Sequence, residues 1–142
     1  MLKTIGAVVI GLLGGMAFNM TMVSVTGVLY PVPECIDPEV PEEFAVYMQS
    51  LPTMAYLLVL VAHLGQAGIG AFIAALINKQ SAMLVAMSVG VLSLIGGIIN
   101  MMLMPLPAWM WFEMPMYLAV AYLAGRWVRG RISKTEVKQP QG

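Results

Sequence analysis

Three long stretches of the chain contain no charged residue. They cover residues 4–33, 44–78 and 80–112, and apolar side chains fill most of their positions. A transmembrane helix needs about 20 predominantly apolar residues to cross a hydrocarbon layer of about 30 Å. Each stretch is long enough, and proline, asparagine and glycine near its ends limit the helix it can form. The pattern therefore predicts helices over residues 5–30, 52–77 and 83–104.

A fourth apolar stretch is shorter, because only residues 114–125 separate Glu113 from Arg126. At about 1.5 Å per residue this stretch covers about 18 Å, which is too little to cross the layer alone. Long charged side chains can reach the headgroups from inside a span, so a helix over residues 109–128 is allowed. We predict an all-α membrane protein, with four transmembrane helices in an antiparallel bundle over residues 1–128.

The composition excludes an ordinary soluble domain. Charged residues make up 10% of the 142 residues and apolar residues 60%, and the mean hydropathy is +0.86. A soluble domain carries about 25% charged residues. The seven Lys and Arg balance the seven Asp and Glu. The chain therefore lacks the excess of basic residues that nucleic-acid binding requires, and we expect no nucleic acid as a partner.

If the chain crosses the membrane four times, its basic and acidic residues lie on opposite sides of the membrane. All basic residues fall on the side of the two termini and of the loop at residue 79: Lys3, Lys79, Arg126, Arg129, Arg131, Lys134 and Lys138. Six of the seven acids fall on the other side: Glu34, Asp37, Glu39, Glu42, Glu43 and Glu113. Because short cytoplasmic loops are rich in Lys and Arg, this sorting predicts that both termini are cytoplasmic.

Two segments lie outside the predicted spans. The outer loop, residues 31–51, is predicted to contain a short amphipathic helix from Pro41, since Glu42 and Glu43 would favour the start of a helix. Its Cys35 has no second cysteine in the chain for an internal disulfide. The tail, residues 129–142, is predicted to be flexible, basic and cytoplasmic, and to attract anionic lipid.

Small residues spaced four apart predict where the spans touch, because helices in lipid associate through close backbone approach. Such pairs occur in each predicted span, mostly toward its cytoplasmic end, although this spacing is also common in any apolar helix. The predicted packing residues are Gly11, Gly15, Ala67, Gly70, Ala71, Ala86, Gly90, Ala121 and Gly125.

A polar layer is predicted near the middle of the bundle. Asn19, His63 and Ser93 each lie eleven residues from the outer end of their span, and Gln66 follows His63 by one turn. One interpretation is interhelical hydrogen bonding that fixes the register, and the other is a proton-sensitive site or a polar constriction. Glu113 is predicted to lie about 10 Å above this layer, which disfavours a direct ion pair with His63.

The fourteen methionines are concentrated toward the outer side. Thioethers bind Cu(I), whereas methionine is also an adaptable filler of apolar packing. Packing is the interpretation we prefer, and the weak metal candidates are Met20, Met22, Met101, Met102 and Met104. No Ser, His and Asp set can meet at one depth, so we expect neither an enzyme nor a cofactor.

Four segments carry a resemblance to other proteins. They are YPVP at residues 30–33, YMQSLP at 47–52, AHLG at 62–65, and residues 100–111 with Pro105 and Pro107. Together they resemble an uncharacterised group of small bacterial four-span integral membrane proteins. The resemblance implies a four-helix architecture in a bacterial cytoplasmic membrane, and it carries no catalytic residues.

These observations give two functional hypotheses. The first is a non-enzymatic structural or accessory subunit that packs against itself or against another membrane protein, because the loops are short and catalytic groups are lacking. The second is a homo-oligomeric channel or transporter for a small solute, with Asn19, His63 and Gln66 along the path. Copper binding by the outer methionines is a minor third hypothesis.

Overall fold

Prolines set several of the helix boundaries in the computed structural model, which describes residues 1–136. Pro41 opens the short helix α2 (Pro41–Ser50), and Pro52 is the N-cap of α3 (Thr53–Ile77). Pro107 is the N-cap of the 3-10 helix η2 (Ala108–Phe112). Proline is suited to these places because its φ is fixed and its missing N–H is not needed there.

The described residues form helices and contain no strand, which confirms an all-α chain. Besides α2, α3 and η2, the elements are α1 (Leu2–Leu29), η1 (Lys79–Ser81), α4 (Ala82–Leu103) and α5 (Glu113–Glu136). The short helix predicted from Pro41 is confirmed as α2. Three segments are long and apolar enough to cross a membrane, namely Leu2–Leu29, Thr53–Ile77 and Lys79–Leu103.

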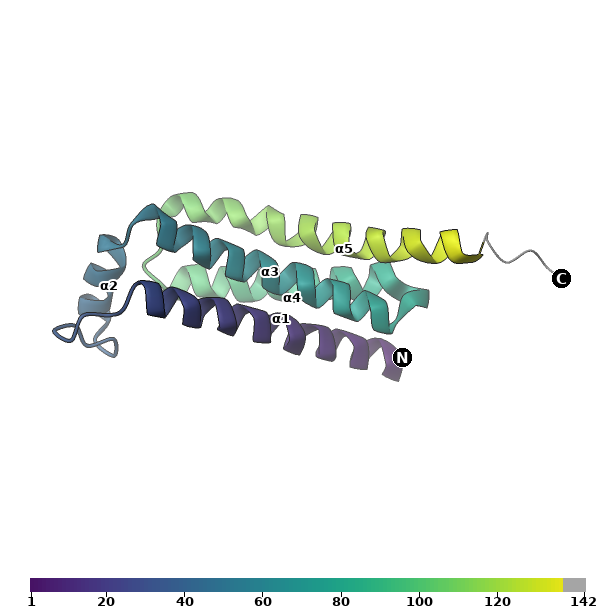
Figure 1. Cartoon of the computed structure of the whole chain (residues 1–142), viewed down its shortest axis with the longest axis horizontal. Coiled ribbons are helices and arrows are strands. Elements are labelled where there is room, and N and C mark those ends of the chain that lie inside the picture. The colour runs from purple at the N-terminus through teal and green to yellow at the C-terminus, as the bar shows by residue number, and fades with distance from the viewer. Residues whose placement is uncertain (137–142) are drawn as a thin grey trace.

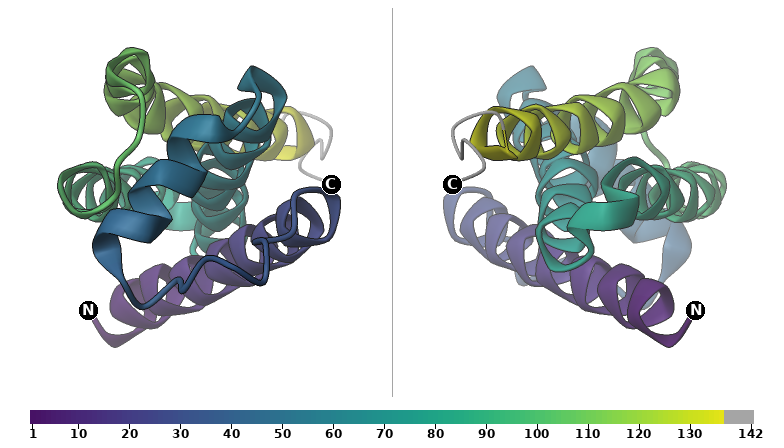
Figure 2. Two further views of the ribbon diagram at one scale, coloured as in Figure 1. Left: turned by 90° about the vertical axis from the view of Figure 1, so that its left-hand side faces the viewer. Right: turned by 90° about the vertical axis from the view of Figure 1, so that its right-hand side faces the viewer.

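The four long helices lie side by side, and each runs opposite to the one before it (Figure 1). The N-terminus and the far end of α5 lie at the same end of the molecule, together with η1 (Figure 1). We call this the η1 end. At the opposite end α2 lies across the long helices (Figure 2), and we call this the α2 end.

Glycines allow the helix backbones to approach closely. A Cβ on Gly15 of α1 would lie 2.3 Å from the backbone oxygen of Gln66 in α3, and one on Gly90 of α4 would lie 2.5 Å from the Cβ of Ala121 in α5. The predicted packing residues are all buried: Gly11, Gly15, Ala67, Gly70, Ala71, Ala86, Gly90, Ala121 and Gly125. Gly11 and Gly15 contact α3, while Gly90 and Gly125 contact their partners between α4 and α5.

The core differs between the two ends. Toward the η1 end it is made of small apolar side chains, among them Ala71, Val85, Val89 and Ala121. Toward the α2 end a second cluster contains larger and more flexible side chains, namely Tyr56, Met101 and Met110. The core of the η1 half therefore has the smaller side chains.

The end of α5 differs from the prediction. The helix continues to Glu136, whereas residues 129–142 were predicted to be flexible. Arginine and lysine are good helix formers, and the Arg131 guanidinium lies 3.7 Å from the centroid of the Trp127 ring, one turn earlier. Residues 137–142 lie outside the described residues.

Candidate functional site

Glu113 is the acid that the fold buries. Its exposed fraction is 0%, although Glu113 is a charged residue type that is rarely buried without partners. It is the first residue of α5, where the partial positive charge of a helix N-terminus stabilises a carboxylate. Pro115 follows in the same turn, which a helix tolerates because the first N–H groups have no intrahelical partner.

Two side chains bind the Glu113 carboxylate directly. The Nδ1 atom of His63 in α3 lies 3.1 Å from Oε1 and 3.3 Å from Oε2, so a proton on Nδ1 is shared between both oxygens. The Tyr117 hydroxyl donates to Oε1 at 3.3 Å from the next turn of α5. The His63 side chain is 14% exposed. We call His63, Glu113 and Tyr117 the acid cluster.

The prediction that disfavoured a direct contact between Glu113 and His63 is wrong, because Nδ1 and Oε1 lie 3.1 Å apart. That prediction counted residues from the outer end of each span and assumed that Trp109 lies level with Pro52 at the start of α3. In the structure the Trp109 ring packs edge-on against Tyr56, which lies about one turn inside α3, with centroids 6.4 Å apart. The residues that follow form η2, and a 3-10 helix rises about 2.0 Å per residue rather than about 1.5 Å. Both effects bring Glu113 down to His63.

Tyr117 occupies space that a glycine leaves open. A Cβ on Gly97 of α4 would lie 2.6 Å from the Tyr117 hydroxyl oxygen and 2.7 Å from the ring carbon that carries it. Tyr117 is 2% exposed. Any larger residue at Gly97 would therefore displace the phenol that donates to Glu113.

Ser93 lies at the seam where α3, α4 and α5 meet. On α4, Gly90 and Gly97 contact α5, whereas Val89 contacts α3. The helical spacing places Ser93 between these two directions. Ser93 is 3% exposed, and its hydroxyl has no hydrogen-bond partner among the described residues. It is thus a buried polar group with an unused hydrogen-bonding capacity, one turn of α4 from the Gly97 that faces Tyr117.

The remaining members of the predicted polar layer lie between α1 and α3. Gln66 packs against Gly15, and Asn19 follows Gly15 by one turn on the same face of α1. Asn19 is buried and Gln66 is half-buried. No hydrogen bond joins Asn19, His63, Gln66 and Ser93 to one another in the part of the chain that the structure describes. His63 instead binds Glu113 and belongs to the acid cluster.

The five candidate methionines have different surroundings. Met101 is buried with Tyr56 and Met110 at the α2 end, whereas Met20, Met102 and Met104 are exposed, and Met22 is half-buried. Residues 1–136 also contain no group of three or more His, Cys, Asp or Glu that could hold a metal ion. Cys35 is free and exposed.

Other polar contacts hold the two ends of the molecule. At the η1 end, the Asn78 amide donates to the Thr4 hydroxyl at 3.1 Å and so joins α3 to α1. At the α2 end, the Tyr47 hydroxyl donates to the backbone oxygen of Tyr30 at 2.6 Å, and the Tyr56 hydroxyl donates to that of Met48. Burial raises the pKa of Tyr47 above its ordinary value, so this hydroxyl remains a donor in mildly alkaline solution as well.

Sequence reasoning missed Tyr117 and set Glu113 apart from His63. A signal was present, because Glu113 and Tyr117 are four residues apart and so share one face of a helix. A buried acid in a span also requires a partner, and His63 is the one histidine in the chain. The acid cluster can exchange protons, and the described residues place no nucleophile in it. No known protein family, characterised protein or solved structure matches the chain.

Proposed function

We propose that the chain crosses a bacterial cytoplasmic membrane four times, with η2 and α5 together forming the fourth span. The α-helical residues 113–128 cover about 24 Å at about 1.5 Å per residue. The 5 residues of η2 add about 10 Å at about 2.0 Å per residue. The combined length of about 34 Å exceeds the hydrocarbon thickness of about 30 Å. Trp109 and Trp127 are both half-exposed and lie near opposite ends of this span, as interfacial tryptophans do.

The distribution of charge supports a cytoplasmic η1 end. Lys3, Lys79 and Arg131 belong to segments at that end (Figure 1), and the acidic loop with α2 lies at the other. Since cytoplasmic loops are rich in Lys and Arg, the α2 end is then the outer end and both termini are cytoplasmic.

Within this topology, the chain acts as a non-enzymatic membrane subunit that binds a proton at the acid cluster. The observation that carries this proposal is the fully buried Glu113 carboxylate, bound to His63 inside the spans. Asp and Glu within transmembrane segments are rare, and they commonly belong to ion pathways or proton relays. If this hydrogen bond only fixed the register of the helices, two neutral side chains could form it, and neither a carboxylate nor an imidazolium would be needed.

The cluster has a defined proton balance. When Nε2 of His63 carries a proton and a further proton is shared between Nδ1 and the Glu113 carboxylate, the pair has no net charge. One more proton converts the carboxylate to a carboxylic acid while the imidazolium remains, so the pair gains one positive charge. A net charge at this depth is costly, and we therefore expect proton uptake to change the packing around Glu113.

Protons reach the cluster from the outer side. A surface cavity of about 400 Å³ opens at the α2 end, and it is lined by Gln49, Tyr56, Pro105, Leu106 and Pro107. Tyr56 precedes His63 by seven residues and so lies two turns above it on the same face of α3. The methionines packed at this end are flexible fillers that can rearrange.

Apolar packing blocks a proton path from the acid cluster toward the η1 end. Toward the η1 end the seam continues past Ser93 to Val89 and Ala121, which are both 0% exposed. The cluster is thus a one-sided site rather than a channel through the bundle. The path suggested for a channel used Asn19 and Gln66, but the proton site uses His63 without them.

The partner with which such a subunit would assemble has to bind to the exposed surface of the helices. The glycine contacts predicted to join helices are made inside the chain, so they support no oligomer by themselves. A second copy or another membrane protein would bind through the exposed apolar faces, which include Val9 and Leu13 of α1.

Infrared difference spectroscopy of the protein in lipid tests proton binding. When the buffer is acidified, we expect the carbonyl band of a buried carboxylic acid to appear. The band should be absent in Glu113→Gln and unchanged in Glu39→Gln, since Glu39 is exposed.

Two results would overturn the proposal. If the wild type shows no such band while remaining folded, the cluster only fixes the register of α3 and α5. If the band persists in Glu113→Gln, another group takes up the proton.

A further inference from the structure

Arg126 has no partner among the residues that the structure describes. It is exposed, and among the described residues its guanidinium makes no hydrogen bond or ion pair. The neighbouring Trp127 packs against Phe72 of α3, with ring centroids 5.1 Å apart. Phe72 lies five residues before Ile77, the last residue of α3, which corresponds to about 7.5 Å from the end of that helix. The backbone of Arg126 is therefore inside the span rather than beyond it.

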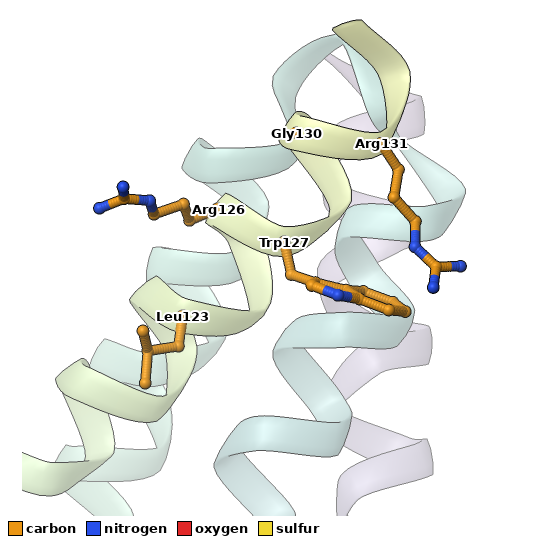
Figure 3. A pocket seen from close by; sticks show the side chains of 5 residues that line it. All are labelled: Leu123, Arg126, Trp127, Gly130 and Arg131. Atoms are coloured by element: carbon orange, nitrogen blue, oxygen red, sulfur yellow. The ribbon is translucent and has the colours of Figure 1, made fainter. Parts of the chain in front are cut away.

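The residues around Arg126 form a surface hollow on α5. The hollow has a volume of about 520 Å³ and is lined by Leu123, Arg126, Trp127, Gly130 and Arg131. Figure 3 shows Trp127 between Arg126 and Arg131, whose side chains leave the helix in opposite directions. Gly130 adds no side chain, and nothing lies within 4 Å of the place where its Cβ would be.

The chemistry of this hollow is that of a phosphate group joined to an acyl chain. The Arg126 guanidinium offers a fork of donors that suits a phosphate. The Trp127 indole N–H is a further donor without a partner among the described residues. Arg131 adds positive charge, since its guanidinium lies 3.7 Å from the Trp127 ring centroid. Leu123 precedes Arg126 by one turn and extends the hollow toward the hydrocarbon.

We infer that this hollow binds one anionic phospholipid of the cytoplasmic leaflet. Its phosphate pairs with Arg126 and accepts from the Trp127 indole, and one acyl chain lies along Leu123. This inference rests on the proposed membrane topology but not on proton binding at Glu113, so the two can fail separately.

Quenching of Trp127 fluorescence by brominated phospholipids tests the inference. A Trp109→Phe, Trp111→Phe background leaves Trp127 as the one fluorophore of its type. In mixed vesicles we expect brominated phosphatidylglycerol to quench more strongly than brominated phosphatidylcholine. Arg126→Gln should lower this preference about fivefold, because a basic residue near an anionic surface contributes about 1 kcal/mol.

The matched control is Arg129→Gln, which removes an equal charge from an exposed arginine of α5 that does not line the hollow. Native mass spectrometry of the otherwise unaltered chain gives a second readout, namely the number of phosphatidylglycerol molecules retained. Equal losses for Arg126→Gln and Arg129→Gln would mean a diffuse charge effect and would overturn the inference. Competition by soluble glycerol phosphate would also overturn it, because the ligand would then be a free phosphate and not a lipid.

Discussion

The coupling between His63 and Glu113 can be measured with a double-mutant cycle. His63→Leu removes the imidazole and leaves the carboxylate with Tyr117, whereas Glu113→Gln keeps a group that still accepts from both neighbours. The double variant removes both ionisable groups. The interaction free energy is the part of the double change that the two single changes do not account for.

The structure sets the expected size of this coupling. With Nδ1 and Oε1 at 3.1 Å, two unit charges attract by about 5 kcal/mol at an effective dielectric constant of about 20. Desolvation of the buried pair offsets part of this attraction, so we expect a coupling of about 2 to 3 kcal/mol. Neutral interhelical hydrogen bonds in membranes average about 0.6 kcal/mol and reach at most about 1.7 kcal/mol. The expected coupling exceeds that range.

A second pair in the same chain provides the control. Asn78 and Thr4 also join two helices, and their hydrogen bond has the same length, 3.1 Å, but neither residue is ionisable. Both cycles are read as free energies of unfolding from titration with denaturing detergent in mixed micelles. We expect the Asn78→Ala and Thr4→Ala cycle to give about 0.6 kcal/mol. A His63–Glu113 coupling no larger than this control would refute a charged pair.

Other predictions concern packing, topology and the position of α2. Gly15→Ala should destabilise the protein by about 1 to 3 kcal/mol, because its Cβ would lie 2.3 Å from a backbone oxygen of α3, whereas Gly6→Ala meets nothing within 4 Å and should be neutral or stabilising. In cells, an impermeant maleimide should label Cys35 directly, but should label Gln80→Cys in a Cys35→Ser background only after permeabilisation; the opposite pattern would invert the topology. Tyr47→Phe removes the hydrogen bond that holds α2, and faster amide exchange throughout α2 should follow, corresponding to about 0.5 to 1.5 kcal/mol.

The local features of the fold could be predicted from the sequence. Charge-free stretches, prolines and the small-residue spacing act within one helix or between helices joined by short loops, so α1, α3 and α4 and the buried glycines agree with the pattern. The continuation of α5 to Glu136 was missed, because basic residues were taken as the start of a tail. Arginine and lysine in fact support a helix beyond a span.

The site required information that the pattern does not contain. Counting residues from the end of each span gives a depth only if every span begins at the same level and rises at the same rate. Trp109 instead packs against Tyr56, about one turn inside α3, and η2 rises faster than an α-helix. Tyr117 was overlooked because a tyrosine in an apolar helix is usually packing, and only Gly97 on another helix shows where its hydroxyl points.

The irregular start of the proposed fourth span is the reason that an acid can be held at this depth. The prolines at 105 and 107 interrupt the helical pattern after α4, and the chain returns as η2 before α5 begins at Glu113. Because α5 starts inside the bundle, its N-terminal partial charge acts on Glu113 together with His63 and Tyr117. A continuous α-helix from residue 105 would place that partial charge at the membrane surface and leave Glu113 with its two side-chain partners alone. Proton binding by Glu113 should therefore depend on the η2 geometry as well as on His63.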